Sequence, residues 1–399
     1  MIAYTMKNPL KAYDWGHPTY IHDLLGGPPG LPAVQAELWL GAHPGDSSQV
    51  DTASGLQPLN ELISSEPAYW LGDKLAAAGE RSLPFLLKIL AASKVLSIQC
   101  HPSMASARDG FAREEAAGIA IKAPERSFKD ARHKPELFVA LTPFAALAGF
   151  RSMMSISQDL RELAFRAQPG TASAQTLLEL ANTAAKGQVI DLCREILSIP
   201  RGDEVLKTLV ELSEKTDGER YQRLVASAKD HESDPGLFFF LVLELVKLEA
   251  GQAMFTPAGV LHAYLEGACI EIMANSDNVL RGGLTNKIID IPALLANIDP
   301  EGHTELVTPV VTSNGVVRSY RTSAREFTLD RLASTQGDAL SLPPSSGPRI
   351  VLCIQGTIKV EADNGTVTLE HGQSCILTSS DNGLGLSVNG LAFIAGIPE

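Results

Sequence analysis

Three short segments, far apart in the chain, carry side chains that commonly bind metal ions. They are Gln99-Cys100-His101, His133-Lys134-Pro135-Glu136 and the run that ends in Pro257-x-Gly259-x-x-His262. In an extended strand alternate residues point the same way, so Gln99 and His101 would share a face while Cys100 turns away. Neutral imidazoles with one or two oxygen ligands suit zinc and other first-row divalent ions. A fold that gathers all three segments around one ion is therefore tightly constrained.

The third segment has a spacing that resembles a known metal motif. Gly251-x5-Pro257-x-Gly259-x2-His262 places strand-like apolar positions before a Pro/Gly turn that would aim His262 into a barrel mouth. This is similar to the second half of the cupin metal motif, whose first half normally reads H-x-H followed shortly by Glu. Here Gln99 replaces the first His, and Glu136 follows only after a long insertion. Taken alone, His101 or His262 is better explained as a hydrogen-bonded core histidine, but the motif context favours metal ligands.

A longer series of blocks resembles one family within the cupins. The blocks read YDWG at 13–16, AELWLGAHP at 36–44, PFLLKIL at 84–90, LSIQCHP at 96–102 and CIEIMANSDNVLRGGLTNK at 269–287. Their content and order resemble the type I mannose-6-phosphate isomerases from the N-terminus to about residue 300. Departures occur at Cys100, Asn275, Gly282 and Asn286, where that family more often carries Ala, Ser, Ala and Pro. None of these changes removes a side chain assigned to the chemistry.

The resemblance implies a zinc-dependent isomerase that interconverts D-mannose 6-phosphate and D-fructose 6-phosphate through an enediol. This activity would serve mannose metabolism or GDP-mannose supply. It places one Zn²⁺ per chain, and Arg281 corresponds to the family's essential arginine. The resemblance assigns the metal to Gln99, His101, Glu136 and His262.

The proton carrier is open on sequence alone. Lys134 lies two residues from Glu136 and would face the same cavity on a strand, where a metal cation could lower its pKa. Glu271 is the alternative base. Tyr264 would share a strand face with His262, and both Tyr264 and His133 are equally well explained as support for the metal ligands.

Several cations in the blocks are candidates for binding a phosphosugar. Arg281 could fork onto a phosphate or stabilise an enediolate, and Lys287 and Lys88 could also meet the phosphate. Asp277 could orient Arg281 from four residues away or simply close a turn. Lys94 is a further cation of this kind, although each lysine taken alone is better explained as a solvated surface charge.

Composition excludes other classes of protein. A net charge of −13 argues against a general nucleic-acid surface. The longest apolar run, residues 237–248, contains Glu244 and Lys247 and predicts a buried helix, not a membrane span. The N-terminus shows no signal-peptide pattern, so we expect a cytoplasmic protein, and we expect a monomer. Five cysteines without CxxC spacing indicate reduced structural thiols.

The pattern along the chain predicts a mainly β protein with an inserted α-helical domain. Residues 1–150 would form the first part of a catalytic cupin domain, 151–250 the helical insertion and 251–340 the completion of that domain with a connection. Residues 341–399 would form the C-terminal part of a metal-free jelly roll, with turns at Gly356, Asn364-Gly365 and His371-Gly372. Local helices are also predicted at 59–75, at 105–117 and near Pro292.

Two other functions remain compatible with the sequence. One is a related metal-dependent cupin enzyme that acts on another phosphosugar or oxidises its substrate with iron. The other is a non-catalytic regulator that binds a sugar phosphate. The presence of Arg281, Lys134 and all four ligand candidates speaks against the regulator, because binding alone does not require that set.

Overall fold

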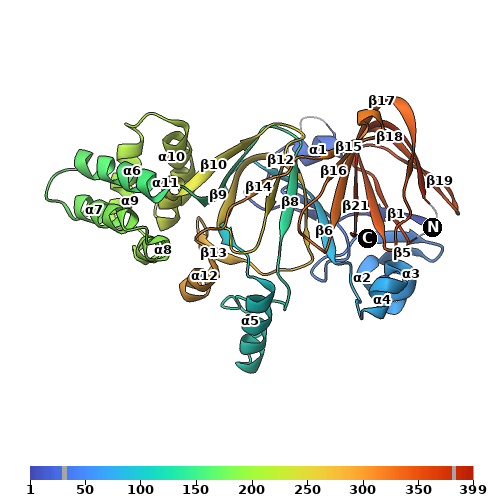
Figure 1. Ribbon diagram of the computed structural model, residues 1–399, viewed down its shortest axis with the longest axis horizontal. Coiled ribbons are helices and arrows are strands. Elements are labelled where there is room, and N and C mark those ends of the chain that lie inside the picture. Colours follow the sequence, from blue (N-terminus) through green and yellow to red (C-terminus); the bar gives the residue numbers. More distant parts are fainter. Residues whose placement is uncertain (29–33, 380–382, 399) are drawn as a thin grey trace.

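The computed structural model describes residues 1–28, 34–379 and 383–398, and its architecture is mainly β with an inserted helical body, as predicted. Two large antiparallel sheets lie next to one another, and the helical body extends from the far edge of one of them (Figure 1).

The first sheet carries the predicted ligand segments, and its longest strand is β12 (His262–Ala274). Strand β12 pairs with β6 and β8 along its C-terminal half and with β7 and β9 near His262. The other strands extend this sheet on both sides. Their bounds are β2 Leu10–Lys11, β3 Glu37–Leu40, β6 Phe85–Ala92, β7 Ile98–Cys100, β8 Glu136–Ala140, β9 Phe144–Phe150, β10 Leu243–Leu248, β11 Ala253–Thr256, β13 Leu280–Gly283 and β14 Glu305–Leu306.

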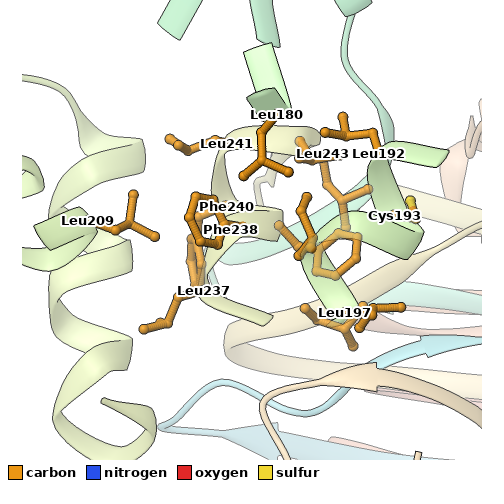
Figure 2. Close-up of a cluster of buried hydrophobic side chains, with 14 of the residues drawn as sticks. Leu180, Leu192, Cys193, Leu197, Leu209, Leu237, Phe238, Phe240, Leu241 and Leu243 are labelled. Carbon is orange, nitrogen blue, oxygen red and sulfur yellow. The ribbon is translucent and has the colours of Figure 1, made fainter. Parts of the chain in front are cut away.

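The helical body occupies the chain between β9 and β10. Side-chain oxygens of Ser152, Thr171 and Asp203 cap its helices α6, α7 and α9 by accepting hydrogen bonds from backbone N–H groups. Leucine and phenylalanine side chains from several helices meet in one core (Figure 2). The helices are α6 Met153–Arg166, α7 Ala172–Ala185, α8 Val189–Ser198, α9 Glu204–Ser213, α10 Glu219–His231, the 3₁₀ turn Pro235–Phe238 and α11 Phe239–Val242.

The prediction of a buried helix over residues 237–248 was half wrong. The chain is helical only to Val242, and residues 243–248 form strand β10, which pairs antiparallel with β9. Glu244 and Lys247 are exposed while Leu243 and Leu248 are buried, a pattern that suits a strand at the side of a sheet. Pairing with β9 therefore overrides the local preference for a helix.

The second sheet contains the C-terminal strands together with three strands from the N-terminal region. Its order is β15-β16-β17-β21-β18-β20-β1-β4-β5, with β19 paired to β18. Residues 1–150 thus contribute to both sheets. The bounds are β1 Ala3–Lys7, β4 Gln49–Thr52, β5 Gly55–Pro58, β15 Val310–Thr312, β16 Val317–Tyr320, β17 Thr328–Leu342, β18 Arg349–Ala362, β19 Gly365–Leu369, β20 Ser374–Leu377 and β21 Leu384–Gly396.

The turn predicted at Gly356 is not a turn. Gly356 lies inside the long strand β18, whose pairing with β21 shifts register between Cys353 and Gln355. The chain bends there without reversing. The hairpin at Asn364-Gly365 is present, because Ala362 pairs with Gly365.

Short helices complete the fold. They confirm the helices predicted at 59–75, at 105–117 and near Pro292. No helix in the described part of the chain is both long and apolar enough to span a membrane. The elements are α1 Tyr20–Leu24, α2 Leu59–Ser65, α3 Pro67–Leu71, α4 Asp73–Ala77, α5 Met104–Ala116, α12 Ile291–Asn297 and the 3₁₀ turn Ser313–Gly315.

Candidate metal centre

Three of the four predicted metal ligands converge at one buried point. Nε2 of His101 lies 3.2 Å from Oε1 of Glu136, and Nε2 of His262 lies 3.3 Å from Oε2 of the same carboxylate. One ligand atom from each residue lies within 4.8 Å of the other two. All three residues are at most 4% exposed. The predicted meeting of segments 99–101, 133–136 and 257–262 is therefore present.

The hydrogen bonds of the two histidines leave the right atoms free for a metal ion. Nδ1 of His101 lies 2.8 Å from the carbonyl oxygen of Asn278, and Nδ1 of His262 lies 2.9 Å from that of Val260. Each Nδ1 must donate to its carbonyl, so each Nε2 presents a lone pair. Nε2 of His101 is buried without a hydrogen-bond partner among the described residues. Two nitrogen lone pairs facing one carboxylate fit a divalent cation such as zinc.

Burial also keeps the first histidine in the form that binds metals. Desolvation lowers the pKa of His101 to about 4, although the neighbouring Glu136 opposes this shift. A neutral imidazole is the form that coordinates a metal ion. If His101 were only a hydrogen-bonded histidine of the core, its buried Nε2 would be expected to have a hydrogen-bond partner. It has none among the described residues.

Gln99 lies next to this cluster in the sheet. It pairs directly with His262 across β7 and β12 and with Arg281 across β7 and β13. Directly opposed residues of antiparallel strands project to the same face. The amide of Gln99 also donates from Nε2 to Oγ of Ser97 at 3.2 Å.

A lysine predicted as the proton carrier touches the cluster. Nζ of Lys134 lies 2.8 Å from Oε1 of Glu136, and the lysine is only 6% exposed. Burial opposes ionisation of Glu136, but Lys134 and the two histidines hold its pKa well below the ordinary value. His101 and Lys134 therefore both contact Oε1 of the charged Glu136 carboxylate.

A second set of charges lies behind Lys134 on strands β3, β6 and β12. Nζ of Lys88 lies 3.0 Å from Oε2 of Glu271 and 3.4 Å from Oε1 of Glu37. The hydroxyl of Tyr264 donates to Oε1 of Glu271 at 2.9 Å, and Trp39 donates from Nε1 to Oε2 of Glu37 at 2.7 Å. Burial raises the pKa of Glu271. Tyr264 contacts one oxygen of Glu271 and Lys88 contacts the other, so both oxygens of this carboxyl group have a partner.

Lys88, one of the candidates for binding the phosphate, already has two acidic partners. Lys88 is 6% exposed and lies between two carboxylates. Burial alone would lower its pKa, but Glu37 and Glu271 raise it above the ordinary value. The charge of Lys88 is therefore compensated by two carboxylates, whereas Arg281 and Lys287 have no such partners among the described residues.

Arg281 and Lys287 do share a cavity. It has a volume of about 390 Å³ and is also lined by Tyr13, Trp15 and Lys94. Nη1 of Arg281 contacts the carbonyl oxygen of Val279 at 3.5 Å. No carboxylate pairs with Arg281 or Lys287 in the described part of the chain. Two cations without acidic partners therefore face this cavity.

Of the two roles left open for Asp277, contact with Arg281 is not present among the described residues. Oδ1 of Asp277 instead lies 3.3 Å from Nε2 of His43. Burial opposes ionisation of Asp277, but the hydrogen bond and charge of His43 lower its pKa to about 2. Residues 275–279 form a loop, not a helix, so a spacing of four residues does not bring the two side chains together.

The loop that holds His101 in place was not predicted. The side-chain amide of Asn278 donates from Nδ2 to the carbonyl oxygens of Asp130 and Arg132, both at 2.8 Å. Its Oδ1 accepts from the backbone N–H of Lys129 at 2.7 Å. Asn278 is fully buried, and its own carbonyl is the partner of His101. We call this set of bonds between residues 129–132 and Asn278 the asparagine clamp.

Replacing Asn278 by alanine should weaken metal binding without removing a ligand. The clamp would loosen, His101 would lose its fixed orientation, and zinc affinity should fall about 10- to 100-fold. Equilibrium competition with a chromogenic chelator measures this change. Asn275→Ala is the matched control, because its Nδ2 donates to the carbonyl oxygen of Leu83 at 3.0 Å and takes no part in the clamp. An Asn278→Ala protein that is less stable but binds zinc normally would contradict the clamp's role.

Sequence reasoning also missed His43, although it lies in a block that was noticed. Strand β3 ends at Leu40, and the turn after it carries His43 towards Asp277 and the ring of Trp39, 4.8 Å away between centroids. The alternation of Glu37 and Trp39 around the buried Leu38 was the available signal that this block faces a site.

The sheet and the buried pair of histidines with one carboxylate define a metal-dependent enzyme of the cupin type. The model for the catalytic domain of type I phosphomannose isomerases matches residues 3–153. The chain is 36% identical over 397 residues to mannose-6-phosphate isomerase from Salmonella typhimurium, covering 96% of each, and 35% identical over 382 residues to that from Escherichia coli, covering 94% of each. The chain belongs to the type I phosphomannose isomerase family.

Solved structures agree with this assignment. The crystal structure of a zinc-bound mannose 6-phosphate isomerase superimposes with a TM-score of 0.88 at 32% identity, and the alignment covers 100% of both chains. Single-site mutants of phosphomannose isomerase from Salmonella typhimurium match equally well, with one at a TM-score of 0.88 and 32% identity.

Proposed function

We propose that the protein is a zinc-dependent isomerase that interconverts D-mannose 6-phosphate and D-fructose 6-phosphate. The observation that carries this proposal is the buried cluster of His101, Glu136 and His262 with Lys134 against it, in a chain similar along almost its full length to enzymes of that name. Gln99 completes the proposed ligand set from the neighbouring strand position.

The reaction moves a proton between C1 and C2 of an open-chain sugar through an enediol. Zinc, when bound, supplies a Lewis acid that stabilises the negative charge developing on the sugar oxygens. Glu136 is the one carboxylate in the ligand set.

Lys134 is the better placed of the two predicted bases. Its Nζ lies at the metal cluster, whereas both oxygens of Glu271 are already held by Tyr264 and Lys88. We assign Lys134 to the proton transfer: its neutral amine takes the proton from one carbon as the enediol forms, and the resulting ammonium returns it to the other carbon. Glu271 and Tyr264 then fix the wall of the site and hold Lys88 behind it.

The cavity next to Arg281 is suited to the phosphate. Arg281 and Lys287 face it, and neither is neutralised by a carboxylate in the described structure. A guanidinium binds a phosphate with two parallel hydrogen bonds and stays charged throughout the reaction. Asp277 contributes by holding His43, whose Nε2 lies 3.3 Å from its Oδ1.

The biological setting follows from this reaction. We propose that the enzyme is a cytoplasmic monomer that acts on a small phosphosugar and supports mannose use or GDP-mannose supply.

A coupled assay of mannose 6-phosphate conversion to fructose 6-phosphate tests the activity. We expect turnover by the purified protein, loss of turnover with a chelator and recovery with added zinc. Substrate recovered from deuterium oxide should carry deuterium at C1 or C2. An oxygen requirement would indicate an oxidising cupin enzyme, and binding without turnover would indicate a regulator; either result would refute the proposal.

A further inference from the structure

A second charged cavity lies away from the metal centre. It has a volume of about 760 Å³ and is formed where α4, α5, residues 131–133 and the C-terminal end of the chain meet. We call it the junction groove. Figure 1 shows α2, α3 and α4 below the C-terminal strands in this view. Its basic side chains are Lys74, Arg108, Arg132, His133 and Arg325.

More basic than acidic side chains line the groove. Arg132 pairs with Glu80 at 2.8 Å, and His133 pairs with Glu326 at 2.6 Å. Among the described residues no other carboxylate lines it, and the exposed Lys74, Arg108 and Arg325 form no ion pair with any described side chain. The whole chain carries a net charge of −13, so a local excess of positive charge runs against the overall field.

The groove is distinct from the site already described. None of the metal ligands lines it, and neither do Arg281 or Lys287. Lys134, one residue beyond the groove-lining His133, points instead to Glu136. A ligand in the groove would therefore leave the sugar-binding cavity open.

The floor of the groove is also one half of the asparagine clamp. Arg132 lines the groove with its side chain, and its carbonyl oxygen accepts a hydrogen bond from Nδ2 of Asn278 at 2.8 Å. Asp130 accepts from Oγ of Ser276 at 2.9 Å and from the backbone N–H of Arg132 at 2.9 Å. The same short loop thus faces the groove on one side and supports His101 through Asn278 on the other.

We propose that the junction groove is a regulatory binding site for a small molecule with two or more negative charges, of the phosphate-ester class. Three unpaired cations on different elements suit more than one anionic group, and the cavity falls within the range of roughly 300–1,000 Å³ that is usual for small-molecule sites. A ligand held by Lys74, Arg108 and Arg325 would lie against residues 131–133, which line the same groove, and would limit the motion of this loop and so tighten the support of His101. Bound anion and bound zinc would then favour each other.

Calorimetric titration with propane-1,3-diyl bisphosphate tests the binding. The titration uses the zinc-loaded full chain with Arg281→Gln and Lys287→Gln, so that the sugar-phosphate cavity cannot hold the probe. We expect one equivalent to bind, and we expect Lys74→Ala/Arg325→Ala to weaken binding by about tenfold or more. Arg318→Ala/Lys359→Ala removes the same charge from exposed positions outside the groove and should change the affinity less than about twofold. No binding, or equal weakening by both double variants, would overturn the proposal.

The regulatory part has its own measurement. Release of zinc from the otherwise unaltered protein to a chromogenic chelator should slow about fivefold when the probe is saturating, at the low end of ordinary coupling between two sites. The slowing should disappear in Lys74→Ala/Arg325→Ala and persist in Arg318→Ala/Lys359→Ala. All four side chains are exposed, so these variants should fold normally, which circular dichroism can verify. Zinc release that the probe leaves unchanged would refute the coupling.

Discussion

Glu136→Gln should abolish zinc binding and, with it, all measurable isomerase activity. Three groups converge on this carboxylate: Nζ of Lys134 at 2.8 Å, Nε2 of His101 at 3.2 Å and Nε2 of His262 at 3.3 Å. Glutamine keeps the shape of the side chain but removes its charge and turns one oxygen into a donor. Loss of a ligand should cost more than the loss of an outer partner, so zinc affinity should fall by more than about 100-fold.

Zinc content after dialysis and the coupled isomerase assay measure the two effects. Glu114→Gln provides a matched control, because Glu114 is also 6% exposed or less and also holds a buried cation, Arg126, at 2.9 Å. It should lose stability while keeping one zinc per chain. If Glu136→Gln retained stoichiometric zinc and normal turnover, the three-residue cluster would not be the metal centre.

The convergence of the segments that carry His101, Glu136 and His262 was predictable in part because strand alternation and turn spacing act over short distances. Gln99 and His101 are two residues apart, and the Pro257-Gly259 turn precedes His262 by only a few residues. The family blocks then supplied the partnership of these segments with Glu136. Contacts within one segment, or between segments that a known fold brings together, could therefore be predicted from the sequence.

Contacts that depend on which strands pair, and in which register, could not be predicted from the sequence. Lys88 lies opposite Glu271 on β12 and opposite Trp39 on β3, which places Glu37 and Glu271 on either side of it. Nothing in the sequence around Lys88 shows which strands flank β6. Its neutralisation by two carboxylates could only emerge from the pairing.

A bulge in β12 allows another contact, between Tyr264 and Glu271, that the regular alternation of side chains along a strand would not predict. Tyr264 and Glu271 are seven positions apart, so in a regular strand they would face opposite sides. The pairing of β12 with β9 shifts register between Tyr264 and Glu266, and Gly267 follows with a φ of 122°, which disfavours any residue but glycine. This irregularity brings the tyrosine hydroxyl within 2.9 Å of Oε1 of Glu271.

Arg281→Gln should lower kcat/KM by about 100- to 1,000-fold while leaving zinc in place, the range typical of removing one donor to a developing oxyanion. Arg281 faces the cavity of about 390 Å³ without a carboxylate partner in the described structure, so its charge is available to the substrate. Its strand position opposite Gln99 places it beside the metal cluster. The lost charge should affect both phosphate binding and the transition state, so KM should rise and kcat should fall.

Lys94→Gln is the matched control, because Lys94 lines the same cavity but already pairs with Asp230 at 2.9 Å. Steady-state kinetics should show less than about a threefold change for this exposed and compensated cation. Arg281→Lys should recover only part of the activity, since an ammonium keeps the charge but not the fork of parallel donors. Equal losses in Arg281→Gln and Lys94→Gln would mean that the cavity acts through its general positive potential. Full activity in Arg281→Gln would remove the arginine from the mechanism and leave Lys287 as the remaining unpaired cation facing the sugar phosphate.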